Sequence, residues 1–281
     1  MKSTRPVRRW QPSLREPLWV RLGLTVIALG FLAMFVVLPV GSVFVAAFEE
    51  GIRPYLAAIF ERDTLHAILL TVLTAAIAVP LNTMFGVAAA WLLSRYRFFG
   101  RGVLLALIDL PFSVSPVIAG LVFVLLFGSR GPFGTWLSAH DVKIVFAIPG
   151  VAIATTFVTF PLVAREVLAV METQGQHEEE AALTLGASGW QIFWHVSLPK
   201  IRWALLYGIL LCNARAVGEF GAVSVVSGHI RGQTNTLPLQ VEILYNDYNF
   251  VGAFAAASLL ALLALVTLVV KRFLLPAEQP T

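Results

Sequence analysis

Six long apolar stretches, separated by short polar segments, dominate the hydrophobic pattern of this chain. A helix that crosses a bilayer needs about 20 mostly apolar residues, and each stretch reaches that length. The pattern therefore predicts an all-α, polytopic membrane protein with about six transmembrane helices. The expected spans are 22–48, 65–93, 102–129, 144–164, 203–228 and 249–270.

Composition supports a membrane protein. Of the 281 residues, 58% are hydrophobic and only 13% are charged, and the mean hydropathy is +0.82. Soluble domains carry about 25% charged residues, so this chain has roughly half the usual share. The single cysteine, Cys212, excludes an internal disulfide and a multi-cysteine metal site.

The third stretch contains a polar, proline-rich interruption. Pro111 and Pro116 leave backbone groups without intrahelical partners, which a membrane tolerates only beside protein or water. Two interpretations stay open: part of a translocation pathway in which Phe112 is an apolar plug, or a kinked helix packed on its neighbours. The candidate pathway residues in this stretch are Asp109, Pro111, Phe112, Ser113, Ser115 and Pro116.

The fifth stretch contains the opposite charges Arg215 and Glu219. Residues four apart share one face of a helix, so this pair is expected to interact. A charge at mid-membrane costs about 2.5–3.5 kcal/mol even on the lenient insertion scale, so neither side chain should face lipid. Either Arg215 contacts a passing anion while Glu219 holds it, or the two form a structural clasp that Asp109 extends.

The basic residues predict the orientation of the chain. They lie mainly in the N-terminal segment and in the loops on the same side of the membrane, which the positive-inside rule places in the cytoplasm. We therefore expect a multi-pass membrane protein with both termini cytoplasmic. The expected organisation is a basic tail (1–21), a first helix with its outer loop (22–64), a membrane domain (65–271) and a cytoplasmic tail (272–281).

The longest predicted cytoplasmic loop is residues 165–202, and its part at about 172–200 has the local pattern of two short helices. Glu178 to Glu180 crowd the first turn of one helix, where the helix dipole favours negative charge. Gly186 is expected in a left-handed conformation after that helix, and Ser188 can cap a second helix over 189–196. Pro199 is expected to end that second helix before the fifth span.

This loop resembles the EAA loop of bacterial ABC-importer permeases. The family pattern is Glu-Ala-Ala, three residues, Gly, nine residues, Ile, one residue and Leu-Pro, and the one departure here is Val for Ile. We call residues 172–200 the EAA loop. The resemblance implies a bacterial inner-membrane protein in which residues 65–271 form a permease domain of the type I (MetI-like) fold. It also implies that the coupling helices dock on a separate ATPase. The matching positions are Glu180, Ala181, Ala182, Gly186, Val196, Leu198 and Pro199.

Three further segments, 109–123, 213–228 and 230–249, are similar to the CysW-type family of sulfate and thiosulfate importer permeases. The resemblance implies a heterodimer with a sister permease, two ATPase subunits that bind ATP and Mg²⁺, and an extracytoplasmic sulfate- or thiosulfate-binding protein. It implies no cofactor on this chain. Molybdate and tungstate permeases share part of the pattern and remain an alternative.

Enzyme classes fit the sequence poorly. No phosphate-binding G-x-x-x-x-G-K-[ST] loop occurs, so ATP hydrolysis is expected on a partner subunit. Gly-Ala-Ser-Gly at 186–189 matches a serine-protease pattern but lies in a charged loop, and Ala181 stands where a zinc-binding His-Glu-x-x-His motif needs its second histidine. A secondary anion transporter, which would use the intramembrane charges for ion coupling, is the remaining rival.

Overall fold

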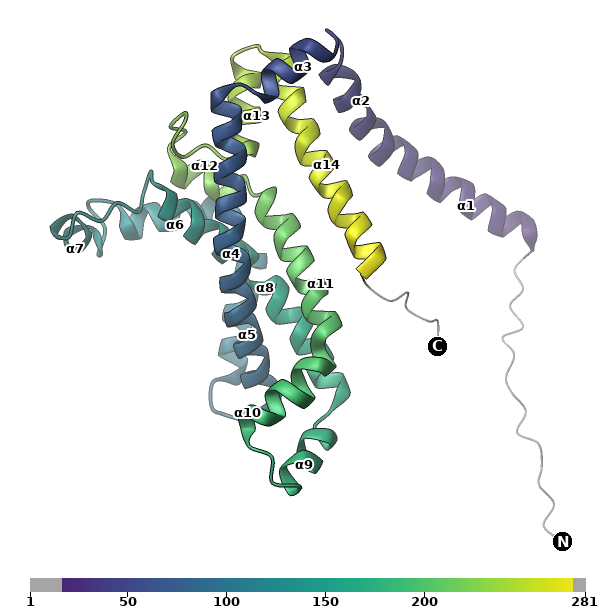
Figure 1. The fold of residues 1–281 in the computed structure, drawn as a ribbon, viewed down its shortest axis with the longest axis vertical. Coiled ribbons are helices and arrows are strands. Elements are labelled where there is room, and N and C mark those ends of the chain that lie inside the picture. The colour runs from purple at the N-terminus through teal and green to yellow at the C-terminus, as the bar shows by residue number, and fades with distance from the viewer. Residues whose placement is uncertain (1–16, 275–281) are drawn as a thin grey trace.

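The computed structural model describes residues 17–274, a range in which every regular element is a helix. Most of the predicted basic tail, up to Arg15, lies outside the described residues, as do residues 275–281. The long helices α4, α8 and α11 run side by side along one axis, with α3 and α13 at one end and α9 and α10 at the other (Figure 1). The elements are α1 (Leu18–Leu32), a π-helix η1 (Ala33–Val37), α2 (Leu38–Ala47), α3 (Ile52–Ile59), α4 (Arg62–Arg95), α5 (Arg101–Ser113), α6 (Pro116–Phe127), α7 (Gly134–Ala139), α8 (Ile148–Gln174), α9 (His177–Thr184), α10 (Gly189–Ile192), a second π-helix η2 (Phe193–Ser197), α11 (Leu198–Val217), α12 (Gly221–Ser227), α13 (Leu237–Asn246) and α14 (Phe250–Leu274).

Within residues 17–274, four helical segments are long and apolar enough to cross a membrane, and the number rises to six when each of two bent pairs counts as one span. In the first pair, α5 and α6 meet at 109°. In the second, the helix that runs from Gly189 to Val217 meets α12 at 49°. The six spans agree with the hydrophobic pattern, and both breaks fall inside predicted stretches.

Proline produces the break between α5 and α6. Pro116 is the first residue of α6, and a residue before proline avoids helical dihedral angles. Ser115 accordingly has a ψ of 132° and Val114 a ψ of 134°. Pro111, in contrast, lies inside α5 and does not end it.

Small residues let the two breaks touch. A Cβ atom at Gly221 would lie 2.9 Å from Cβ of Pro116, and one at Gly120 would lie 2.7 Å from the carbonyl oxygen of Ala222. Both distances are shorter than any real Cβ contact, so the approach of α6 to α12 requires glycine at both positions. The interrupted halves of two different spans therefore meet within the bundle.

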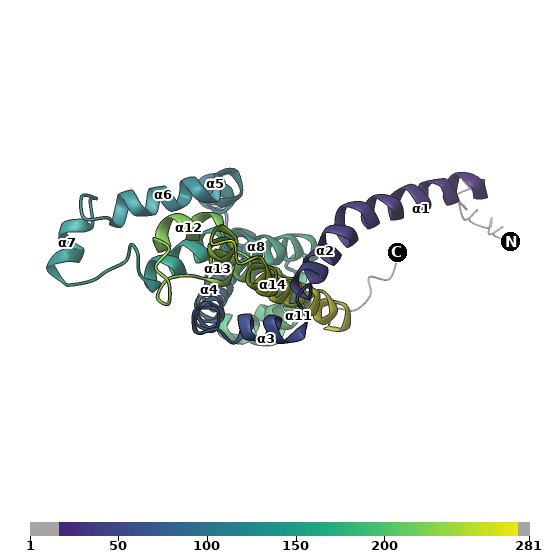
Figure 2. The same cartoon turned by 90° about the horizontal axis from the view of Figure 1, so that it is seen from above.

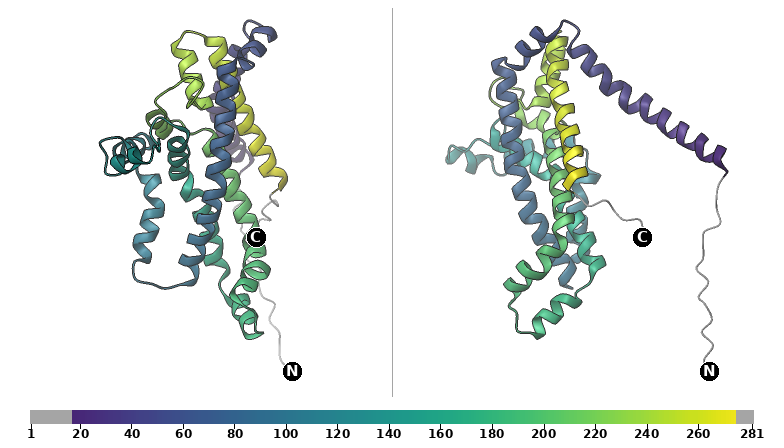
Figure 3. Two further views of the ribbon diagram at one scale, coloured as in Figure 1. Left: turned by 60° about the vertical axis from the view of Figure 1, so that its left-hand side comes forward. Right: turned by 45° about the vertical axis from the view of Figure 1, so that its right-hand side comes forward.

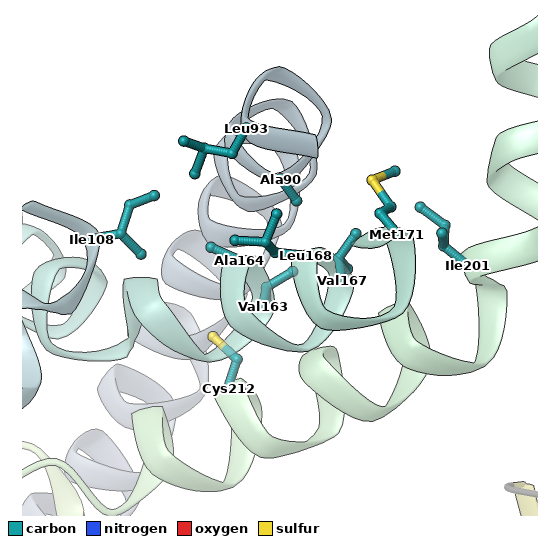
Figure 4. Packing of buried hydrophobic residues seen from close by; sticks show 10 residues of the cluster. All are labelled: Ala90, Leu93, Ile108, Val163, Ala164, Val167, Leu168, Met171, Ile201 and Cys212. Atoms are coloured by element: carbon teal, nitrogen blue, oxygen red, sulfur yellow. The ribbon is translucent and has the colours of Figure 1, made fainter. Parts of the chain in front are cut away.

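The core of the bundle is formed by α4, α8 and α11, with α5 on its edge. Its buried side chains, drawn in Figure 4, are mostly small or branched. A polar contact crosses the same core, because Nδ2 of Asn82 donates to Oγ1 of Thr159 at 2.7 Å and lies 3.6 Å from Sγ of Cys212. Because the amide nitrogen of Asn82 on α4 finds its partners on α8 and α11, it fixes how these three helices are aligned. The cluster consists of Ala90, Leu93, Ile108, Val163, Ala164, Val167, Leu168, Met171, Ile201 and Cys212.

Two parts of the chain extend away from this core on opposite sides (Figures 2 and 3). None of the residues of α1 is buried, and the segment joins the bundle through α2, which packs on α14. On the other side, α6 and α7 project outward. Large apolar side chains stay exposed along α1, so lipid or a partner protein must cover them.

The fourth span is longer than the sequence indicates. The hydrophobic stretch ends at Ala164, and Arg165 was assigned to the cytoplasmic loop. In the structure α8 continues to Gln174, so Arg165 lies within the helix. The helix is longer than the apolar stretch because hydropathy reports where apolar residues stop, whereas a helix continues while its backbone hydrogen bonds are made.

Candidate functional site

The EAA loop folds as two helices at one end of the bundle (Figure 1). In the turn after α9, N–H of Gly186 donates to the Leu183 carbonyl at 3.0 Å and N–H of Ala187 donates to the Ala182 carbonyl at 3.1 Å. These two bonds form a Schellman motif. Gly186 has a φ of +85°, which confirms the predicted left-handed conformation, and its Cβ position is otherwise open.

The second helix of the loop begins at the predicted cap. Oγ of Ser188 accepts from N–H of Gln191 at 3.4 Å, and Oε1 of Gln191 accepts from N–H of Ser188 at 2.8 Å, which is a reciprocal capping box. The Gly-Ala-Ser-Gly sequence therefore stabilises the start of a helix.

The predicted stop at Pro199 is wrong. The helix that starts at Gly189 passes through η2 and continues into α11, where Pro199 lies in the first turn. Proline lacks an N–H group and is accepted at such a position, and the wide π turn just before it separates Pro199 from the preceding carbonyls. The second half of the loop is consequently one continuous helix with the fifth span.

The tip of the EAA loop presents an apolar surface. Leu185 is 88% exposed, Trp190 is 71% exposed and Leu183 is 65% exposed. Glu180 and Ala181 are exposed beside them, whereas Ala182 and Val196 are half-buried. An exposed patch of this kind on an ordered helix pair is typical of a protein-docking surface.

A buried ion pair holds this loop on the bundle, and sequence analysis missed it. Nε of Arg95, the last residue of α4, lies 2.5 Å from Oε2 of Glu179, and Nη2 donates to Oε1 at 2.5 Å. Oγ of Ser197 in η2 donates to the same Oε1 at 2.6 Å. One carboxylate thus connects α4, α9 and the start of α11. The partners are 84 residues apart, so no local pattern could reveal them.

Beside this ion pair, a cavity of about 500 Å³ separates the end of α4 from the loop. Trp91 and Tyr96 line it from α4 and the residue after it, and Leu183 and Ile192 line it from the loop. Besides the Arg95–Glu179–Ser197 contacts, the loop is attached to α4 by the edge-to-face packing of Phe193 on Trp91 and by a hydrogen bond from Nε2 of Gln176 to the Ser94 carbonyl.

The second candidate region is the break between α11 and α12. Nη2 of Arg215 lies 3.1 Å from Oε2 of Glu219, as the spacing predicted. Because α11 ends at Val217, Glu219 lies in the break itself, where its Oε1 accepts from N–H of Ala222 at the start of α12. The Glu219 side chain is only 1% exposed, whereas that of Arg215 is 49% exposed.

Asp109 does not extend this pair, so that part of the clasp hypothesis is wrong. Its carboxylate instead makes a bidentate ion pair with Arg165 of α8, with Nε of Arg165 2.5 Å from Oδ1. Asp109 was expected to lie beside Arg215. This expectation failed because the sequence does not show which faces of the two helices meet.

The remaining candidate pathway residues surround the break between α5 and α6. Phe112 is 58% exposed, and Ser113 and Ser115 are also exposed. Pro111 is buried and lines an apolar cavity of about 740 Å³ between α4, α5, α6 and α8. Within residues 17–274 no group of three or more His, Cys, Asp or Glu side chains could hold a metal ion.

The geometry defines a class of protein: a helical membrane protein with broken spans and an exposed loop that a buried ion pair holds on the bundle. The family described as "binding-protein-dependent transport system inner membrane component" matches residues 82–278, and the chain belongs to this family. Membership agrees with the resemblance drawn from the EAA loop and with the expectation that the chain is a permease component and not an enzyme.

Curated relatives cover most of the chain. It is 54% identical over 256 residues to the sulfate transport system permease protein CysW of Escherichia coli (strain K12), covering 91% of this chain and 87% of that protein. The CysW protein of Synechocystis sp. is 55% identical, covering 93% and 94%. The sulfate transport system permease protein CysT of E. coli (strain K12) is 36% identical, covering 85% and 86%.

Among solved structures, a bacterial alginate ABC transporter in complex with an alginate-bound periplasmic protein aligns with a TM-score of 0.74. The alignment covers 91% of this chain and 92% of that one at 16% identity, so it supports the fold alone. The expected ABC-importer permease fold is confirmed.

Proposed function

We propose that this chain is a translocating subunit of an ATP-driven importer that carries sulfate or thiosulfate into the cytoplasm. The observation that carries the proposal is the EAA loop: its tip is exposed for docking, while its base is fixed to α4 and α11 through Glu179. A partner that moved α9 would therefore move two membrane helices. The substrate class rests on the names of the CysW relatives.

The proposed partners follow from the exposed surfaces. The matching positions of the EAA loop, from Glu180 to Pro199, form the ATPase-docking site of the proposal. The uncovered α1 and the exposed apolar face of α6 suit a sister permease. The CysT relative suggests a second, similar chain for that role. The outer loop 229–249, in which His229 contacts Glu242 and Arg231 forms an ion pair with Asp247, is the proposed contact with the binding protein.

Inward transport of a dianion needs an energy source, and the EAA loop favours a partner ATPase over the secondary-transport alternative. Moving a charge against a negative-inside potential costs about 2.3 kcal/mol per 100 mV, and a dianion doubles that cost. In the proposed cycle the loaded binding protein docks outside, ATP closes the ATPase dimer, and the EAA loop transmits the movement. ATP and Mg²⁺ bind to the partner ATPase and not to this chain.

Reconstitution tests the substrate. The permease, its sister subunit, the ATPase and the binding protein are assembled in proteoliposomes, and ATP hydrolysis and uptake are measured with sulfate, thiosulfate and molybdate. We expect sulfate or thiosulfate to stimulate hydrolysis at least about tenfold more than molybdate. Stimulation by molybdate alone would favour the molybdate permease alternative, and uptake driven by a proton gradient without ATP would favour a secondary transporter.

The proposed orientation places the EAA loop and both termini in the cytoplasm. It has its own test, in which Cys212 is replaced by Ala and single cysteines are introduced at Gln233, exposed near α13, and at Ser188, exposed in the EAA loop. An impermeant thiol reagent applied to intact cells should label the cysteine at position 233 and spare that at 188. The reverse pattern would invert the topology and remove the loop from the side where ATP is available.

A further inference from the structure

An ion pair inside the bundle has no place in the proposed docking or gating elements. Asp109 of α5 and Arg165 of α8 form a bidentate pair, and their side chains are 31% and 48% exposed in this chain. Helix α5 lies at the edge of the core and packs mainly on α8, whose side toward α5 carries Arg165. The pair is therefore accessible from one side of the subunit.

The pair lies at a depth where lipid would surround an outward-facing side chain. Ala164, next to Arg165, packs on Gly86 of α4. At 1.5 Å per residue, Gly86 is roughly 14 Å from Arg95 at one end of α4 and roughly 36 Å from Arg62 at the other. Arg165 and Asp109 thus lie within the inner half of the membrane, where exposed charges must face water or another protein.

A second ion pair between the same helices lies closer to the cytoplasmic end. Nη2 of Arg101 in α5 lies 2.8 Å from Oε1 of Glu172 in α8. The two pairs have opposite polarity, because α5 supplies the cation in one and the anion in the other. From Asp109, one further turn along α5, away from the EAA loop, leads to Ser113 at the helix break, so the Asp109–Arg165 pair and not the Arg101–Glu172 pair lies next to that break.

We propose that Arg165 is an anion-contacting residue in the cytoplasmic half of the translocation pathway, and that Asp109 is its exchangeable counter-charge. A guanidinium presents paired N–H donors that suit an oxyanion as well as a carboxylate. Asp109 occupies these donors when no anion is present, and an arriving oxyanion displaces it. Return of Asp109 then weakens the hold on the dianion and favours its release. The inference rests on the proposed function, since it assigns a residue to that pathway.

The two charges should contribute unequally to transport. Arg165→Gln leaves Asp109 alone in the pathway to repel a dianion, and we expect uptake to fall at least about tenfold. Asp109→Asn keeps the cation, so the initial uptake rate should stay within about threefold of wild type. The double variant Asp109→Asn/Arg165→Gln should assemble normally, keep the ATPase activity stimulated by loaded binding protein, and still lose uptake.

The control is the Arg101–Glu172 pair. Arg101→Gln and Glu172→Gln remove charges from the same two helices at side chains that are 38% and 49% exposed, and both should leave uptake within about threefold. A structural ion pair would give a different pattern for Asp109 and Arg165: equal damage by the two single variants, and recovery of uptake in the double variant. Equal damage by the two single variants, or recovery of uptake in the double variant, would overturn the proposal.

Thiol labelling tests whether water reaches the face of α8 that carries Arg165. Ala169 is exposed one turn from Arg165 on the same face of α8. In a Cys212→Ala background, Ala169→Cys in the assembled complex should react with a hydrophilic thiol reagent in inside-out vesicles, and sulfate should slow the reaction. Val266→Cys on the exposed face of α14 is the lipid-facing control and should not react. An unreactive Ala169→Cys would mean that a partner subunit covers the pair, which contradicts the proposal.

The outcome is separable from that of the proposed function. If the wild-type complex fails to import sulfate in the same assay, the proposed substrate is wrong, and the variants are then measured with the oxyanion that it does import. If wild type imports sulfate and the asymmetry between Arg165 and Asp109 is absent, the assignment of Arg165 alone fails.

Discussion

Glu179→Gln should reduce uptake at least about tenfold and weaken the attachment of the EAA loop to the membrane helices. The Glu179 and Arg95 side chains are 9% and 10% exposed, so the substitution leaves a buried guanidinium without a counter-charge. Removing one partner of a buried pair costs about 3–5 kcal/mol. Oγ of Ser197 loses its charged acceptor at the same time. The measurements are co-purification of the ATPase with the variant and sulfate uptake by the assembled complex.

Glu178→Gln is the matched control for this prediction. Glu178 precedes Glu179 in the same helix and also has a basic partner, Lys200, at 3.3 Å, but its side chain is 66% exposed. Exposed ion pairs contribute about 0–1 kcal/mol, so this variant should behave as wild type. The double variant Arg95→Met/Glu179→Leu should recover assembly, because an apolar pair leaves no buried charge. Normal uptake by Glu179→Gln at normal expression would show that the ion pair does not transmit the movement of the loop.

Arg215→Met should abolish both assembly and uptake. The substitution leaves the carboxylate of Glu219 buried in the break between α11 and α12, with the Ala222 N–H as its remaining partner. The expected cost is about 3 kcal/mol or more. We expect less than a tenth of the wild-type amount of complex after co-purification with the sister subunit.

Adding Glu219→Leu separates the two roles proposed for this pair. The double variant has no buried charge and should assemble. We expect its uptake to stay at least about tenfold below wild type, because a guanidinium that is 49% exposed at a helix break is placed to contact an anion and not only to hold a buried partner. Recovery of uptake together with assembly would make the pair a structural clasp. Normal assembly and uptake by Arg215→Met alone would exclude both roles.

Much of the EAA loop was predictable because its signals are local. The left-handed Gly186 and the Ser188 cap depend on hydrogen bonds between residues at most five positions apart, and both are observed. The helix end predicted at Pro199 is wrong for the opposite reason. Whether proline ends a helix or starts its next turn depends on the backbone around it, here a π-helical segment that the sequence does not announce.

The sequence by itself determined the chain's class: apolar stretches of membrane length, breaks at proline and glycine, and a docking loop with a recognisable spacing. These properties follow from hydropathy and from backbone preferences that act over a few residues. Only the tertiary structure decided which charges meet. It paired Arg95 with Glu179 and Asp109 with Arg165. It also kept Asp109 away from the pair of Arg215 and Glu219. The physical reason is that a buried charge must find its counter-charge in space, and packing of the helices, not distance along the chain, decides which one lies within reach.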